Sequence, residues 1–189
     1  MCKLRQEESH MGGRMGLGGL FRKRDDVAVG PAPLVVEARE GEVLAPVSGV
    51  RVGLDTVSDP VFSQGLMGVG VGIVPRSDVV YAPVSGTIVA TTKTNHAISL
   101  TSDGGVEVLV HVGVDTVTLR GEGFTRFAEK GDHVEAGAAL ITFDRSSVVE
   151  HGLDSTVIVT VLNGDAYPSV ELLAMGPVAA GDVVMHVGS

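Results

Sequence analysis

The chain has 189 residues and a net charge of −9; 44% of its residues are hydrophobic, 26 are glycine, and tryptophan is absent. No apolar run approaches the ~20 residues of a membrane-spanning helix, and Cys2, the single cysteine, excludes a disulfide framework and a cysteine metal site. Residues 27–189 hold eight Lys/Arg against 19 Asp/Glu, which argues against a nucleic-acid partner. Because no signal-peptide pattern is present, we expect a cytoplasmic protein.

Residues 1–33 are rich in glycine and methionine and lack sustained hydrophobic periodicity, which predicts a mobile N-terminal tail before a domain at 34–189. Within the tail, "MGLGGLFRKRDD" (15–26) joins a short apolar patch to basic residues. Its glycines disfavour a helix, so this amphipathic segment predicts only weak contact with a membrane surface.

From residue 34 onward, short runs rich in Val, Ile and Thr follow one another between Gly and Pro residues, a pattern typical of strands and tight turns. The expected strands lie within 34–38, 41–47, 49–54, 69–75, 78–84, 86–92, 96–102, 106–114, 116–119, 138–144, 155–163 and 182–187. The only good helical candidate is "RSSVVEHGL" (145–153). The fold class is therefore all-β, an antiparallel β-sandwich or barrel-sandwich hybrid with only short helical segments.

One segment of the sequence is repeated. "LAPVSGVRVGLDTV" starts at 44 and "YAPVSGTIVATTKT" starts at 81, an offset of 37 residues. A single repeat is too short for a solenoid, so we expect two related halves that pack with pseudo-symmetry.

His111 is an imidazole within the apolar run "VEVLVHVGV", where a buried, hydrogen-bonded core histidine is the ordinary interpretation. The preceding "SDGG" favours a two-residue turn at 103–104. That turn makes His96 face His111 across the ladder and Thr94 face Gly113.

Two facing neutral imidazoles suit a reversible phosphohistidine, because one ring nitrogen attacks while the second ring donates a hydrogen bond. We expect Gly113 to leave space for a phosphoryl group and Thr94 to offer a hydroxyl to the same space. A nucleotide-binding Gly-rich loop and a Mg²⁺ carboxylate cluster are not evident, so the phosphoryl group would come from another protein and leave for another.

At residues 94–124, "TNHAISLTSDGGVEVLVHVGVDTVTLRGEGF" resembles the glucose-type enzyme IIA (EIIA) of the bacterial phosphoenolpyruvate-dependent sugar phosphotransferase system. The resemblance extends over about 40–188. It implies an antiparallel β-sandwich and an enzyme of the phosphotransferase class. The implied partners are the phosphocarrier HPr, the IIB/IIC sugar permease, and regulated permeases or kinases.

The resemblance also assigns roles to individual residues. It implies that His111 accepts the phosphoryl group from HPr as a tele-phosphohistidine and passes it to a cysteine of the IIB domain. In this interpretation His96 stabilises or donates to the phosphoryl group, and Thr94 forms a hydrogen bond with the phosphate or with His96. It places Asp115 on a shallow active-site face around His111. It also implies that three residues of "SDPVF" contact a partner, namely Asp59, Val61 and Phe62.

Two other classes share parts of this pattern. Biotinyl and lipoyl carriers have similar "APVSG" and "KGDHVEAG" segments, but Lys93 and Lys130 lack the hairpin-tip setting of a carrier lysine. Zinc endopeptidases of a related fold use a His-x-x-x-Asp element, which His111 and Asp115 match, together with a His-x-His pair that this chain lacks. We expect no intrinsic cofactor; His96 and His111 could bind zinc only with a further ligand from a partner.

Overall fold

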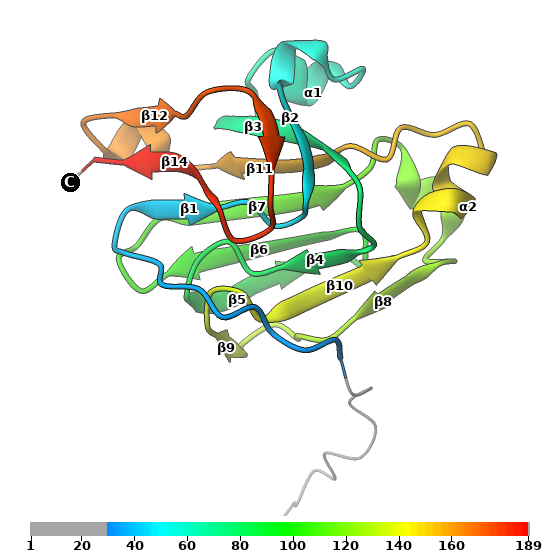
Figure 1. Ribbon diagram of the computed structural model, residues 1–189, viewed down its shortest axis with the longest axis horizontal. Helices are drawn as coiled ribbons and strands as arrows, with labels where there is room; N and C mark the ends of the chain where they lie inside the picture. The colour runs from blue at the N-terminus through cyan, green and yellow to red at the C-terminus, as the bar shows by residue number, and fades with distance from the viewer. Residues whose placement is uncertain (1–29, 189) are drawn as a thin grey trace, which may run out of the picture.

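The computed structural model describes residues 30–188, which fold into fourteen short strands, two α-helices and three 3₁₀ helices (Figure 1). The strands are β1 (Glu42–Leu44), β2 (Gly49–Gly53), β3 (Val69–Pro75), β4 (Val79–Tyr81), β5 (Gly86–Thr91), β6 (Ala97–Ser102), β7 (Glu107–Val112), β8 (Phe124–Arg126), β9 (His133–Val134), β10 (Ala139–Phe143), β11 (Val157–Val161), β12 (Val170–Leu172), β13 (Gly176–Val178) and β14 (Val183–Val187). The helices are η1 (Leu54–Thr56), α1 (Pro60–Ser63), η2 (Thr116–Leu119), α2 (Arg145–Glu150) and η3 (Gly164–Ala166).

The strands form one large sheet and two small ones. The large sheet has the order β13-β2-β3-β11-β7-β6-β5-β9, and the small sheets have the orders β1-β14-β12 and β4-β10-β8. Every paired neighbour runs antiparallel. The expected all-β antiparallel fold class is therefore confirmed.

The middle of the large sheet is buried on both faces. Alternate residues of β6 divide between two apolar clusters: Ile98 belongs to the larger one and Ala97 to the smaller one. All five residues of β11 are buried, which explains why its sequence is a continuous apolar run rather than an alternating one. The larger cluster is the main core, whereas the smaller one also contains Phe62 of α1 and underlies the candidate site.

The two sequence repeats are related by reciprocal hydrogen bonds. The backbone N–H of Leu44 donates to the carbonyl of Pro83 at 2.9 Å, and that of Tyr81 donates to the carbonyl of Pro46 at 2.8 Å. Leu44 and Tyr81 are equivalent at the 37-residue offset, as are Pro46 and Pro83. The two repeated segments therefore contact each other through equivalent backbone groups, as expected for related halves.

Several local predictions are wrong. Residues 116–119 form the 3₁₀ helix η2 instead of a strand, because the chain turns through left-handed conformations just before it, and Thr116 Oγ1 donates to the carbonyl of Val112 at 2.6 Å. Residues 34–38 form no strand, although the Leu34 N–H donates to the Gly137 carbonyl at 2.9 Å. The sequence also did not predict α1 and the short strands β8, β9, β12 and β13.

The predicted amphipathic segment, 15–26, and most of the predicted tail lie outside the described residues. Of the helices in 30–188, none combines the length and the apolar character that crossing a membrane requires.

Candidate functional site

His111 lies near the C-terminal end of β7, on the face of the large sheet that carries the smaller apolar cluster. Its ladder partners are Ala97 of β6 and Ile158 of β11, and both are buried in that cluster. The ring of Phe62, from α1, packs against the imidazole with a centroid distance of 5.1 Å. These apolar neighbours restrain the ring and keep water from much of its surface.

The turn between β6 and β7 has one residue more than the sequence predicts. The N–H of Ser102 donates to the carbonyl of Val106 at 2.8 Å, so the loop consists of residues 103–105. Gly105 has a φ of +85°, as expected for the left-handed residue that closes a three-residue hairpin loop. The ladder is consequently shifted by one residue from the predicted register.

Because of this shift, Ala97 rather than His96 faces His111 across the ladder. The predicted direct pairing of His96 with His111 is therefore wrong. The predicted pairing of Thr94 with Gly113 is wrong as well, because β6 begins only at Ala97.

The two histidine rings nevertheless meet. Their centroids are 5.0 Å apart and their planes are inclined at 76°, an edge-to-face arrangement. His96 precedes the first residue of β6, so it does not follow the alternation of that strand. Asn95 has a φ of +59°, and the Val112 N–H donates to the His96 carbonyl at 2.7 Å. This turn brings the His96 side chain to the face that carries His111.

Two threonine hydroxyls approach Nδ1 of His96. Oγ1 of Thr94 lies 2.6 Å from this nitrogen, and Oγ1 of Thr92 lies 3.4 Å from it. The Thr92 hydroxyl also donates to the carbonyl of Ala97 at 3.3 Å, so Thr94 is the closer partner of Nδ1. When Nδ1 of a neutral imidazole accepts, the ring proton is on Nε2. The contact of Thr94 with His96 was expected. The contact of Thr92 with His96 was not predicted, because nothing in the sequence around Thr92 distinguishes it from an ordinary threonine at the end of a strand.

Burial lowers the pKa of His111 from 6.5 to about 4, and the neighbouring His96 imidazole contributes to this shift. The backbone of Gly113 and the carboxylates of Asp59 and Asp115 act in the opposite direction without cancelling it. Burial also lowers the pKa of His96. Both rings are therefore neutral near pH 7, so each has a nitrogen lone pair available.

The two ring nitrogens of His111 have different surroundings. Nδ1 is buried, and no group of residues 30–188 meets it in hydrogen-bonding geometry. His111 as a whole is partly exposed, so its accessible part lies away from Nδ1. Nε2 is therefore the nitrogen that an incoming group can reach.

Gly113 does not leave open space beside His111. Its φ is +73°, and a Cβ at this position would collide with the Thr116 methyl group and lie 2.8 Å from the Asp154 carbonyl oxygen. The expectation that Gly113 provides room for a phosphoryl group is therefore wrong. This glycine is required by the turn that ends β7 and by its close packing.

The segment "SDPVF" forms the start of α1 beside the histidine pair. Oδ1 of Asp59 accepts a hydrogen bond from the Val61 N–H at 2.8 Å, which caps the helix and orients it. Val61 is 42% exposed, whereas Phe62 is only 4% exposed. Phe62 therefore supports the His111 ring and offers a partner little surface, contrary to the partner contact expected for it.

Exposed apolar side chains occur in the segments that flank the site. Leu66 follows α1 and is 69% exposed, and Val117 lies two residues after Asp115 and is 52% exposed. Together with Val61 they provide exposed apolar side chains in the two segments that also contain Asp59 and Asp115, a combination suited to docking another protein.

The histidine pair supplies only two metal ligands. No group of three or more His, Cys, Asp or Glu side chains within 30–188 is arranged to hold a metal ion. A protein-bound zinc ion ordinarily has three or four protein ligands. The expected zinc contact, with a further ligand from a partner, stays a prediction.

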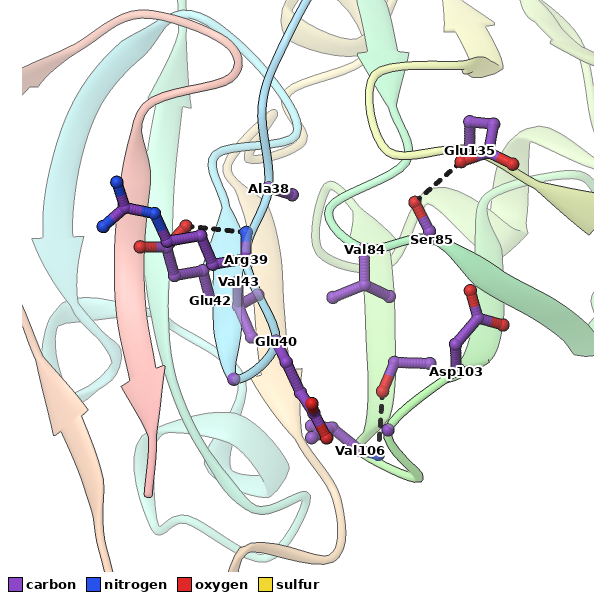
Figure 2. A pocket seen from close by; sticks show the side chains of 13 residues that line it. Ala38, Arg39, Glu40, Glu42, Val43, Val84, Ser85, Asp103, Val106 and Glu135 are labelled. Atoms are coloured by element: carbon purple, nitrogen blue, oxygen red, sulfur yellow. Dashed lines mark hydrogen bonds between the residues drawn. The ribbon is translucent and has the colours of Figure 1, made fainter. Parts of the chain in front are cut away.

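A separate pocket of about 380 Å³ lies at the opposite end of the β6–β7 hairpin (Figure 2). It is bordered by the carboxylates of Glu40, Asp103 and Glu135, the last of which accepts a hydrogen bond from the Ser85 hydroxyl at 3.1 Å. None of its lining residues belongs to the histidine site. The sequence patterns did not point to this pocket.

Comparison with known proteins relates this chain to one protein family. Residues 41–167 match the family model described as phosphoenolpyruvate-dependent sugar phosphotransferase system, EIIA 1. The solved structure of glucose permease IIA from Mycoplasma capricolum superposes with a TM-score of 0.69 at 40% sequence identity, covering 76% of this chain and 93% of that one.

Curated relatives include both short and long proteins. The glucose-specific EIIA component of Halalkalibacterium halodurans is 38% identical over 166 residues, which are 88% of this chain and 92% of the relative. The beta-glucoside-specific EIIBCA component of Dickeya chrysanthemi is 42% identical over 142 residues, and the chain spans only 22% of that longer protein. The chain therefore belongs to the EIIA 1 family of the phosphoenolpyruvate-dependent sugar phosphotransferase system.

Proposed function

We propose that this chain carries a phosphoryl group on Nε2 of His111, accepting it from the phosphocarrier HPr and delivering it to the IIB domain of a sugar permease. The observation that carries the proposal is the edge-to-face pair of His96 and His111, both buried enough to have lowered pKa values. A neutral imidazole with one accessible nitrogen is a nucleophile for phosphorus. The family of the chain, a phosphoryl-transfer component of sugar uptake, supports the same conclusion.

In the first step, the lone pair of Nε2 forms a nitrogen–phosphorus bond while the corresponding bond in phospho-HPr breaks. The HPr imidazole leaves with the bonding electron pair. In the second step, a cysteine thiolate of the IIB domain attacks the phosphorus, and the bond to Nε2 breaks. No nucleotide or external oxidant is needed, because one phosphoryl group moves between three nucleophiles.

His96 is the group that stabilises the transferred phosphoryl oxygens in this proposal. We infer that the Thr94 hydroxyl, 2.6 Å from Nδ1 of His96, donates to this nitrogen. The ring proton of His96 is then on Nε2 and can be donated to a phosphoryl oxygen beside His111. A preorganised donor of this kind stabilises charge more in the transition state than in the ground state.

Docking by a partner would complete the site. The exposed apolar side chains of Val61 and Val117 would be covered on docking, which excludes water and slows hydrolysis of the phosphohistidine. The exposed carboxylate of Asp115 would attract basic partner groups.

The two alternative classes have no comparable support. The family match and the relatives are of the EIIA type and favour neither a carrier nor a peptidase.

The proposal is tested by incubating the protein with phosphoenolpyruvate, enzyme I and HPr and assaying for acid-labile, base-stable phosphate. We expect one phosphoryl group per chain, and none in His111→Gln. His151→Gln is the matched control, because His151 is an exposed histidine at the C-terminal end of α2 and should be replaceable without effect on labelling. Undiminished labelling of His111→Gln would overturn the assignment.

A further inference from the structure

Arg126, the last residue of β8, contacts the turn that precedes His96. Its Nη1 donates to the carbonyl of Thr92 at 2.9 Å and to Oδ1 of Asn95 at 2.8 Å. Its Nη2 forms an ion pair with Glu129 at 2.7 Å, and the side chain is 14% exposed. A largely buried guanidinium with three short hydrogen bonds holds its partners in a defined geometry, because its donors are fixed in one plane.

The turn that Arg126 contacts has a conformation that needs support. Asn95 has a φ of +59°, and its N–H donates to the Thr92 carbonyl at 3.2 Å, closing a four-residue turn. The left-handed conformation costs a residue with a side chain about 1 kcal/mol. Nη1 of Arg126 bonds the first and the last residue of this turn, and so opposes its relaxation.

Both hydroxyls that reach Nδ1 of His96 belong to the same turn. Thr94 lies between the two residues that Arg126 holds, and its Oγ1 is the closer contact at 2.6 Å. Thr92, whose carbonyl Arg126 binds, places the second hydroxyl at 3.4 Å. The orientation of the His96 ring therefore depends on a turn that is anchored from another sheet.

Arg126 is not among the groups that shift the pKa of His111. The groups that shift the pKa of His111 are His96, the Gly113 backbone, Asp59 and Asp115. The hydrogen bonds of Arg126 instead connect it to His96 through the 92–95 turn.

We infer that Arg126 is a positioning residue for phosphoryl transfer: it clamps the 92–95 turn so that Thr94 holds the His96 ring, with its proton on Nε2, beside His111. This inference rests on the proposed function for the transfer step, although the effect on the His96 ring exists without any phosphoryl group.

The first measurement is nitrogen-15 NMR of the histidine rings in the unphosphorylated full chain. In the wild type we expect Nδ1 of His96 to give a pyridine-type shift and Nε2 a pyrrole-type shift. In Arg126→Gln we expect the two shifts to converge, since the tautomer is no longer held, and the pKa of His96 to rise toward its ordinary value. Arg145→Gln is the matched control, because Arg145 also donates to one backbone carbonyl and one side chain. The carbonyl belongs to Pro75 and the carboxylate to Asp78.

The second measurement is the single-turnover rate of delivery from phosphorylated protein to a IIB domain. We expect Arg126→Gln to deliver roughly 10-fold more slowly, since small misplacement of a catalytic group is costly, while Arg145→Gln delivers at the wild-type rate. Asn95→Gly keeps the left-handed conformation but removes one acceptor of Arg126, so an intermediate loss is expected.

The outcomes separate the two hypotheses. Unchanged His96 signals in both Arg126→Gln and Asn95→Gly, or wild-type delivery rates in both, overturn the positioning role. If Arg126→Gln does not fold, Asn95→Gly alone decides. Absence of phosphoryl label on wild-type His111 refutes the proposed function instead, and the ring spectra still report on the clamp.

Discussion

The imidazole rings of His96 and His111 meet edge to face at 5.0 Å, although the two residues are not ladder partners. Ala97 occupies the ladder position opposite His111, and His96 reaches the ring from the turn just before the strand. The residue that carries the phosphoryl group in our proposal is thus held by a strand, whereas its helper is held by a turn. Substitutions in the turn should therefore affect the helper without unfolding the sheet.

Replacement of His96 tests the division of labour between the rings. We expect His96→Gln to accept a phosphoryl group from phospho-HPr but to deliver it to a IIB domain roughly 100-fold more slowly, as for loss of a preorganised donor. Rapid-quench measurement of the two half-reactions separates them. Normal delivery by His96→Gln would show that the second ring has no part in the transfer.

The hydroxyl of Thr94 should contribute less than the ring that it holds. Thr94→Val removes the 2.6 Å contact with Nδ1 of His96 at nearly constant size. Loss of one hydrogen bond of about 1 kcal/mol corresponds to roughly fivefold slower delivery. Thr94→Ser retains the hydroxyl and should recover most of the rate; equal rates for the valine and serine variants would contradict this role.

The lowered pKa of His111 predicts how stability depends on pH. The unfolded chain takes up this proton near pH 6.5, whereas the native state takes it up near pH 4. The unfolded state therefore binds more protons between these values, so the free energy of unfolding falls as the pH is lowered from 6.5 to 4, by about 3 kcal/mol from this group. Above pH 6.5 this contribution is constant.

Urea unfolding at a series of pH values measures this dependence. Carboxylates also titrate near pH 4, so the informative quantity is the difference between wild type and His111→Gln. In His111→Gln the free energy of unfolding should lack the pH dependence that His111 contributes between pH 4 and 6.5. Identical pH profiles for the two proteins would mean that His111 is not buried in its neutral form.

Gly113 should be intolerant of substitution for reasons of packing. Gly113→Ala places a Cβ against the Thr116 methyl and the Asp154 carbonyl in a left-handed conformation. We expect a loss of about 3 kcal/mol in the free energy of unfolding. Gly152→Ala is the control, because Gly152 has nearly the same φ, +74°, but no neighbour within 4 Å of its Cβ position. It should cost about 1 kcal/mol, and equal losses for both variants would leave the packing argument without support.

How far the sequence could predict the site is clearest in the β6–β7 hairpin. The apolar runs on either side of "SDGG" predicted the hairpin, since a turn signal between two such runs is a local property. The turn sequence "SDGG" is compatible with a two-residue or a three-residue loop. The structure has the three-residue loop, which Gly105 closes. The shift by one residue changed every predicted cross-strand pair, yet the His96–His111 contact survived because His96 lies outside the strand.

The sequence by itself determined the strand-rich class, the repeat at 44 and 81, and the two histidines, because periodicity, turn residues and motif spacing are local properties of the sequence. Only the tertiary structure decided which residues reach the histidines. Arg126 is 30 residues from His96, and Gly113 is confined by Asp154, which lies 41 residues further along the chain. Such contacts arise where sheets and loops distant in sequence pack together, and local pattern carries no information about them.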